Sequence, residues 1–496
     1  MSPKSLRSSS EDDVTIKASD ERTPLLTPVA PIPTSAEPLV ANSAVATNEN
    51  SGDEDEDVPL PLAQIFLLAF TRMVEPIVFF GIFPYINSMI EEVGGIDVRD
   101  VGFYSGMIES LFSLVQMCLM IPWGRASDRF GRRPCLVVSL WGITVCAALF
   151  GMSTSIAQMV FFRCLAGSFA GTLVTIRAMV SENSTKKTQA RAFSYFAFAG
   201  NMGIFIGPLL GGTLERPALK FPSTFGRIQF FHDYPYAFPG FITASVGLIA
   251  AILTTFFVKE TLHLKPHQAG QARMSAWNLV KSPGVGRVIF IYNYILLAAF
   301  AFTAVLPVFL HTPINLGGIG FNPVHIAATL SVNGVSQAFW LLVPFPLLQR
   351  GIGTGGVLRI CAAAWPIFMA VHPLCNTFLR HGWKVAFWCV GPISLVVGSG
   401  VAMSFTASQL AINDIAPTHE TLGTLNAVTL TLSCALRAFI PALATSLYAI
   451  GVNYQIANGQ FFWILGIGIA ASMVGVVRLL PAKAEGKPQT QQNGAA

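Results

Sequence analysis

Long apolar stretches recur along the chain from Leu60 to Leu480, separated by short polar segments. Twelve of them are about 20 residues long, which is the length that a helix needs to cross a hydrocarbon core of roughly 30 Å. They lie at about 60–86, 102–124, 134–153, 156–178, 190–212, 237–258, 287–310, 325–348, 356–377, 384–409, 420–449 and 459–480. The pattern predicts an all-α, polytopic membrane protein with twelve transmembrane helices in two six-helix, pseudo-symmetric halves.

The distribution of charge excludes a soluble domain and predicts the orientation in the membrane. Only 11% of the 496 residues are charged, whereas a soluble domain has about 25%. If both termini are cytoplasmic, that side receives 22 of the 31 Lys and Arg residues and the opposite side receives six. This bias follows the positive-inside rule and predicts a multi-pass protein with both ends in the cytoplasm. The basic residues lie in short loop clusters, so no nucleic-acid partner is expected.

Five segments are predicted from these patterns. Residues 1–57 are rich in Ser, Thr, Pro and acidic residues and lack an apolar run, so we expect a disordered, acidic cytoplasmic tail. Six spans at 58–258 and six at 286–481 flank a cytoplasmic linker at 259–285, and residues 482–496 form a second cytoplasmic tail. The segments 190–213 and 423–446 align weakly, which favours a transporter with its substrate path between two repeated halves.

Three motifs follow one another in the first half. The loop after the second span contains a charged motif, and the fourth span contains Arg163 followed by Gly167. The charged motif is formed by Gly124, Asp128, Arg129, Gly131, Arg132 and Arg133. The fifth span carries a glycine motif, formed by Gly203, Gly207, Pro208, Gly211 and Gly212. In these motifs the chain resembles the twelve-span drug:proton antiporter branch of the major facilitator superfamily, although Ser194 replaces a glycine usual in that branch.

The first and eleventh spans are also similar to fungal and plant zinc-induced facilitator-like transporters. The resemblance implies a secondary transporter that exports or sequesters small organic solutes or drugs by alternating access, in exchange for protons. It further implies that the charged motif stabilises the outward-open state. It also implies that the glycine motif packs between the halves and limits proton leakage. From spacing alone, Gly203, Gly207 and Gly211 share one helix stripe that a neighbouring helix can approach closely.

Five charged residues lie within the spans, where a charge is costly and therefore indicates function: Arg72, Glu75, Glu109, Arg163 and Arg437. We expect Glu75 or Glu109 to bind the coupling proton. Glu75 is favoured, because Glu109 is expected nearer the outer surface than the midplane. Pro76 follows Glu75 and is expected to open the helix, which favours a role in transport. Arg72 and Glu75 are three residues apart and are expected to pair, either for transport or for packing alone. The resemblance gives Arg163 a role in proton transfer, and the alternative is a base whose charged end reaches the membrane surface.

Four uncharged polar residues in the spans are candidates for the substrate path: Gln116, Asn201, Asn333 and Gln337. The alternative is that they only form hydrogen bonds between helices. His263 and His267 are too few for a zinc site, so no metal is expected. No phosphate-binding loop or catalytic constellation is found, so we expect no cofactor and no enzymatic activity.

The N-terminal tail contains an acidic dileucine pattern, formed by Glu21, Leu25 and Leu26. It is either a sorting signal read by an adaptor protein or a chance match, and the predicted location is the vacuolar or the plasma membrane. The expected partners are a small-molecule substrate, protons and the lipid bilayer, and the expected state is a monomer. Two alternative functions remain open from the sequence: a proton-independent facilitator and a non-transporting membrane receptor.

Overall fold

The computed structural model describes residues 59–184, 188–262, 276–417 and 419–486. The dileucine residues Glu21, Leu25 and Leu26 and the predicted tail 1–57 lie outside these ranges. All regular secondary structure in the described ranges is helical, and every predicted span coincides with a helix. Ten of the helical segments are long and apolar enough to cross a membrane. Helix α13 (Pro323–Leu342) and the 17-residue α18 (Phe461–Val477) complete the twelve predicted spans.

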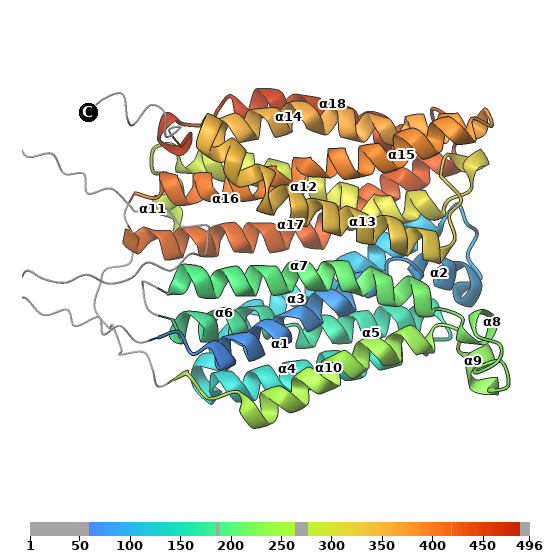
Figure 1. Ribbon diagram of the computed structural model, residues 1–496, viewed down its shortest axis with the longest axis horizontal. Helices are drawn as coiled ribbons and strands as arrows, with labels where there is room; N and C mark the ends of the chain where they lie inside the picture. The colour runs from blue at the N-terminus through green and yellow to red at the C-terminus, as the bar shows by residue number, and fades with distance from the viewer. Residues whose placement is uncertain (1–58, 185–187, 263–275, 418, 487–496) are drawn as a thin grey trace, which may run out of the picture. The chain divides into compact units, whose positions relative to one another are not determined.

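Eight spans are formed by single long helices in addition to α13 and α18 (Figure 1). In the first half these are α1 (Leu62–Gly81), α3 (Val101–Phe130), α4 (Arg132–Phe150), α7 (Gln189–Leu214) and α10 (Ala237–Phe257). In the second half they are α12 (Val285–His311), α14 (Pro344–Arg380) and α17 (His419–Asn453). The remaining regular structure outside the spans comprises α2 (Ile86–Gly94), α8 (Pro217–Lys220), α9 (Gln229–Asp233), α11 (Ala276–Val280), η2 (Ile314–Leu316) and η4 (Ala482–Ala484).

The fourth and tenth spans are interrupted helices. The fourth consists of α5 (Ile156–Phe169) and α6 (Thr172–Glu182), with Ala170 and Gly171 between them. The tenth consists of α15 (Lys384–Gly398), the 3₁₀ turn η3 (Ser399–Ala402) and α16 (Met403–Ile415). A break inside an apolar span leaves backbone groups that the protein interior must satisfy, so both breaks lie where other helices cover them.

Two features at proline and glycine residues differ from the sequence predictions. The predicted eighth span, 325–348, is divided at Val343 between α13, which ends at Leu342, and the start of α14, and Gly353, whose φ is 73°, separates this start from the rest of α14. The predicted opening of the first span at Pro76 is wrong, since α1 runs as one continuous helix through this residue.

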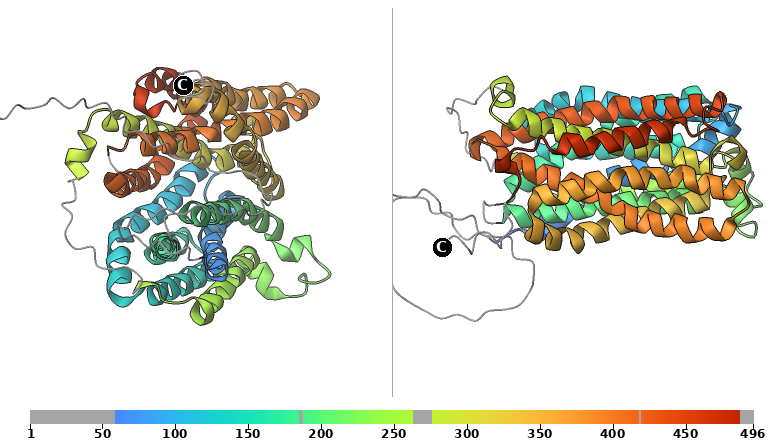
Figure 2. Two further views of the ribbon diagram at one scale, coloured as in Figure 1. Left: turned by 60° about the vertical axis from the view of Figure 1, so that its left-hand side comes forward. Right: turned by 90° about the horizontal axis from the view of Figure 1, so that it is seen from above.

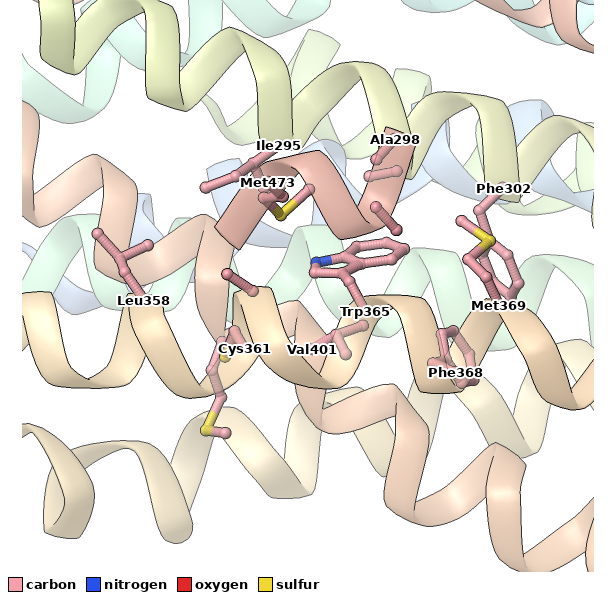
Figure 3. Close-up of a cluster of buried hydrophobic side chains, with 14 of the residues drawn as sticks. Ile295, Ala298, Phe302, Leu358, Cys361, Trp365, Phe368, Met369, Val401 and Met473 are labelled. Carbon is pink, nitrogen blue, oxygen red and sulfur yellow. The ribbon is translucent and has the colours of Figure 1, made fainter. Parts of the chain in front are cut away.

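The buried apolar side chains form two separate clusters. One extends from Ile65 to Val258 and the other from Leu279 to Ala484, so the division falls in the predicted linker. Figure 2 shows the two groups of helices side by side, and Figure 3 shows the second cluster around Trp365. Between the groups, α3 packs against α17 and α7 packs against α13. These two helix pairs form the seam on which the candidate site lies.

Candidate functional site

Glu75 is buried and links three helices of the first half. Its Oε1 accepts a hydrogen bond of 2.8 Å from Nε2 of Gln116 on α3, and its Oε2 accepts one of 2.6 Å from the hydroxyl of Thr172 on α6. Gln116 Nε2 also donates to the carbonyl of Ala170, in the break between α5 and α6, at 3.2 Å. The broken fourth span therefore supplies the position from which Thr172 reaches the carboxylate.

The predicted ion pair between Arg72 and Glu75 is not formed. Its spacing is suitable, but the Glu75 carboxylate is directed toward α3 and α6, whereas the Arg72 guanidinium lies 5.2 Å from the ring centre of Phe196 on α7. Nε and Nη1 of Arg72 are buried and have no hydrogen-bond partner among the described residues. Arg72 is thus a cation held against an aromatic face rather than a member of a local pair.

A second group of charges surrounds Phe79. The guanidinium of Arg437, from α17 in the second half, lies 4.1 Å from the centre of this ring, and that of Arg163, from α5, lies 5.3 Å away. Arg163 also lies 4.8 Å from the ring centre of Phe112, one helical turn after Glu109 on α3. Both arginines are close enough to act electrostatically on Glu109. The seam therefore brings together one carboxylate and two guanidinium groups from three helices.

The exposed fraction of Arg163 tests whether its charged end reaches the membrane surface, which is one of the two alternatives from the sequence. Its side chain is only 2% exposed, and Glu109 is 7% exposed. The guanidinium of Arg163 therefore does not extend to the membrane surface, because its position on α5 faces the interior of the bundle. Its Nε and Nη2 have no hydrogen-bond partner within the described part of the chain. Glu109 likewise forms no hydrogen bond or ion pair with a described residue.

A cavity of about 170 Å³ lies between the two halves. The first half contributes Phe80 of α1, Phe83 just after it, and Ile204 and Pro208 of α7. The second half contributes residues of α12, α13, α14, η3 and α16. Asn333 and Gln337 of α13 line it, as the sequence predicts for a substrate path. The other two candidates do not line this cavity, since Gln116 is bonded to Glu75 and Asn201 is exposed on α7.

The seam is closed tightly where α3 begins and α17 ends. A Cβ atom added to Gly106 would lie 1.7 Å from the hydroxyl of Thr445, and one added to Gly102 would lie 3.2 Å from the Thr445 carbonyl. The backbone N–H of Ala442 donates to the hydroxyl of Ser110 at 2.8 Å. Such an approach is possible only with small residues on α3. The sequence analysis did not identify these glycines, although their spacing of four residues was a visible signal.

The glycine motif of α7 packs differently from what the resemblance implies. A Cβ added to Gly203 would lie 2.6 Å from the carbonyl of Met73, and one added to Gly211 would lie 1.7 Å from that of Gly81. Both contacts are with α1, so the stripe joins two helices of the same half. Gly212 points to the other half, where its Cβ would lie 2.4 Å from that of Ala327 on α13. The stripe fixes α7 on α1 because only glycine permits these distances.

The charged motif forms a network at the opposite end of α3. Arg132 pairs with Asp128 at 2.6 Å and with Glu182 of α6 at 3.1 Å, while the Asp128 side chain remains 65% exposed. Arg133 donates to the carbonyl of Thr255 on α10, and Arg129 lies over the ring of Phe130. Gly131 adopts a φ of 108°, which permits the turn between α3 and α4. Glu182 was not identified from the sequence, because its partners are distant along the chain.

Glu260, at the start of the predicted linker, caps α4. Its carboxylate accepts hydrogen bonds of 2.9 and 3.0 Å from the backbone N–H groups of Arg132 and Arg133. Burial raises the pKa of this carboxyl, but the backbone N–H groups, including those of Thr261 and Leu262, outweigh burial and hold the pKa below its usual range. The linker is therefore anchored to the first half at this residue.

The predicted C-terminal tail, 482–496, begins packed against α14. The backbone N–H of Gly355 on α14 donates a hydrogen bond to the carbonyl of Glu485.

No group of three or more His, Cys, Asp or Glu side chains able to hold a metal ion occurs in residues 59–184, 188–262, 276–417 and 419–486. The eight cysteines are all free thiols.

Comparison with known proteins agrees with this architecture. The chain is 44% identical over 431 residues to "Efflux pump azaK" of Aspergillus niger, covering 86% of this chain and 90% of that protein. It is 23% identical over 439 residues to "Protein ZINC INDUCED FACILITATOR-LIKE 1" of Arabidopsis thaliana, covering 84% and 91%. The fold is similar to the solved human organic anion transporter MFSD10 (TM-score 0.56, 17% identity, 85% of this chain and 100% of that chain).

The nucleoside transporter NupG gives a TM-score of 0.61 at 13% identity, over 84% of this chain and 98% of that chain. The sequence model of the Major Facilitator Superfamily matches residues 66–441, which extend from α1 into α17 and include all three motifs. This chain therefore belongs to the Major Facilitator Superfamily of membrane transporters.

Proposed function

We propose that the protein is a proton-coupled antiporter that removes small organic solutes from the cytosol by alternating access, with Glu109 as the proton carrier. The observation that carries the proposal is a buried carboxylate on α3 that shares the seam with Arg163 and with Arg437 from the other half. A charge at this depth is costly unless another charge compensates it. A change in the charge of Glu109 therefore changes the attraction between the halves.

The surroundings of the two buried carboxylates favour Glu109 over Glu75. Gln116 and Thr172 already occupy both oxygens of Glu75 and tie it to the packing of α1, α3 and α6. Glu109 has no hydrogen-bond donor among the described residues, so it can gain or lose a proton without disturbing such a network. The sequence favoured Glu75, but the opening of the helix expected at Pro76 is not found, since α1 is continuous there.

Alternating access follows from the position of these groups at the seam. With both termini in the cytoplasm, the tight contact between α3 and α17 at Gly106 closes the side away from the cytosol. When Glu109 is ionised, its attraction to Arg437 holds the halves together there. Protonation neutralises Glu109 and removes this attraction. Opening of the side away from the cytosol then no longer has to separate two opposite charges. A ligand or proton shifts such an equilibrium only by its differential affinity for the two states.

The cavity at the seam is suited to an organic solute rather than an ion. Its lining consists mainly of aromatic and aliphatic side chains with the amides of Asn333 and Gln337, the usual composition of small-molecule sites. The relatives described as an efflux pump and as a multidrug transporter of Aspergillus fumigatus are consistent with this class. The alternative is a facilitator that moves the same solutes without protons.

Purified protein in proteoliposomes distinguishes the two functions. A panel of fluorescent solutes of one or two rings is tested in turn, with an outward or inward pH step and no other gradient. Antiport predicts that a dye accumulates in the acidic compartment and that a trapped pH indicator reports proton movement in the opposite direction. Dye exchange across liposomes without any response to the pH step would identify the facilitator.

We further propose that the dileucine residues direct the protein to the vacuolar membrane. A C-terminally tagged copy is localised before and after the double change Leu25→Ala and Leu26→Ala. Redistribution from the vacuole to the plasma membrane supports a sorting signal. An unchanged location would mean that the sequence is not read, and it would leave the transport proposal intact.

A further inference from the structure

A second cavity, of about 240 Å³, lies within the second half and shares no residue with the cavity at the seam. It is enclosed by α12, α13, α14 and α15, with Phe309, Val371 and Pro392 among its lining residues. At its rim are Val332 and Trp388, which are 44% and 57% exposed. Large exposed apolar side chains on a membrane protein face lipid, so the cavity is reached from the bilayer.

His372 of α14 supplies a polar group in this apolar wall. Its ring is stacked on Trp463 at 4.5 Å and contacts the edges of Phe302 and Phe368, two labelled residues in Figure 3. Phe302 and Phe368 also line the cavity at the seam, so the aromatic cluster separates the two cavities. The ring is held in one orientation by contacts on several sides.

The hydrogen bonding of His372 defines what its free nitrogen can do. Nδ1 lies 2.9 Å from the Phe368 carbonyl, which only accepts, so Nδ1 carries the proton and Nε2 of the neutral ring is an acceptor. No described residue bonds Nε2. The nearby hydroxyls of Thr329 and Ser394 donate to carbonyls of their own helices at 2.8 Å. The other imidazole of the lining, His325, has its Nδ1 2.7 Å from Asn322 Oδ1 and is exposed, whereas His372 is partly buried in the aromatic wall. We therefore take His372 as the acceptor for an incoming hydrogen-bond donor.

The volume fixes the size of the occupant. An apolar cavity of about 150 Å³ binds benzene and stays dry, so a cavity of about 240 Å³ fits two fused six-membered rings. We propose that this cavity binds a lipophilic molecule of fused-ring size that carries one hydrogen-bond donor, with the donor on His372 Nε2. The site is independent of the proton coupling proposed above. A saturated lipid chain would fill the same space but would leave Nε2 without a partner.

Paired probes test the site on the full-length protein in nanodiscs. Equilibrium binding of labelled 2-naphthol and naphthalene is measured, with empty nanodiscs as the background for partitioning. We expect saturable binding of both and an affinity for 2-naphthol about fivefold higher, the factor contributed by one net hydrogen bond. Equal affinities, or no saturable binding above the background, would overturn the proposal.

Two variants test the hydrogen-bond acceptor and the volume of the cavity independently. His372→Phe keeps an aromatic ring against Trp463 but removes Nε2, so the preference for 2-naphthol should disappear while naphthalene still binds. Gly391→Leu should abolish binding of both probes. The atoms nearest to an added Cβ at Gly391 belong to Phe387 and Cys375, at 3.7 and 3.9 Å, so the backbone tolerates the change and the longer side chain enters the cavity. A retained preference in the first variant, or unchanged binding in the second, would contradict the assignment.

Discussion

Replacement of Gly106 by alanine should open the seam at the end where α3 begins. The added Cβ would lie 1.7 Å from the Thr445 hydroxyl and 3.0 Å from the Pro441 carbonyl. The Thr445 hydroxyl itself donates to that carbonyl at 2.8 Å. Rotation of Thr445 would relieve the first contact only by breaking this hydrogen bond, and the contact with the backbone would remain. The substitution therefore penalises the closed arrangement of α3 and α17 and not the open one.

The size of the shift follows from the cost of overpacking, which is typically about 1–3 kcal/mol. Because the penalty applies to one conformation only, the equilibrium should move about 5- to 150-fold toward the state in which α3 and α17 are apart. Removal of the clashing hydroxyl in the double variant Gly106→Ala, Thr445→Ala should recover part of this shift. Gly468→Ala on α18 is the matched control, since nothing lies within 4 Å of its added Cβ.

Distance distributions between two spin labels measure this equilibrium directly. The labels are placed at Arg99 and Tyr454, which are exposed on either side of the seam, after the exposed Cys118 and Cys389 have been changed to serine. Gly106→Ala should transfer population to the longer distance, and Gly468→Ala should leave the distribution unchanged. The same distribution in wild type and Gly106→Ala, or an equal change in the control, would refute the reasoning.

The remaining predictions concern the Glu75 network, the cap of α4 and the cavity at the seam. Glu75→Ala should lower the stability of the purified protein by about 1–3 kcal/mol, because it leaves buried donors unpaired. Glu75→Gln can still accept from Gln116 and can donate its amide N–H to the Thr172 hydroxyl, so it should change the melting temperature little. Equal losses in the two variants would contradict the network. Glu260 has a lowered pKa when folded, so its stabilisation is complete above the unfolded-state pKa of about 4.3 and is lost as the pH falls through the folded value. The difference in melting temperature between wild type and Glu260→Ala should therefore be constant near neutral pH and shrink in acid, and a pH-independent difference would refute this. Asn333→Ala should raise the KM of a transported dye about fivefold through the loss of one hydrogen bond, with Asn201→Ala as the control that leaves KM unchanged.

The helices could be predicted from the sequence because each apolar span satisfies its own backbone hydrogen bonds. The positions of Pro344 and Gly353 changed one boundary, which depends on where the chain turns rather than on its hydropathy. The two apolar clusters lie on either side of the predicted central linker, whose anchor at Glu260 depends on α4 and was not visible in the sequence.

The partners in the site could not be predicted, since they are distant in sequence. Gln116 and Thr172 are 41 and 97 residues from Glu75. The spacing of Arg72 and Glu75 predicted an ion pair that is not formed. The orientation of the Glu75 side chain depends instead on the hydrogen-bond donors of neighbouring helices. Arg437 and Phe79 come from opposite halves, so their contact required the tertiary structure. Only the glycine spacing at positions 102 and 106 was a readable signal that the sequence analysis missed.

Transport by Glu109→Gln tests the central claim most directly. Gln has nearly the same size as Glu but cannot bind and release a proton at physiological pH, so the variant should keep the cavity and lose the coupling. In proteoliposomes, a dye transported by the wild type is followed in two assays, accumulation driven by a pH step and exchange at equal pH on both sides. If Glu109 carries the coupling proton, Glu109→Gln exchanges the dye and no longer accumulates it, while Glu75→Gln still does both. Wild-type accumulation of the dye by Glu109→Gln would contradict it.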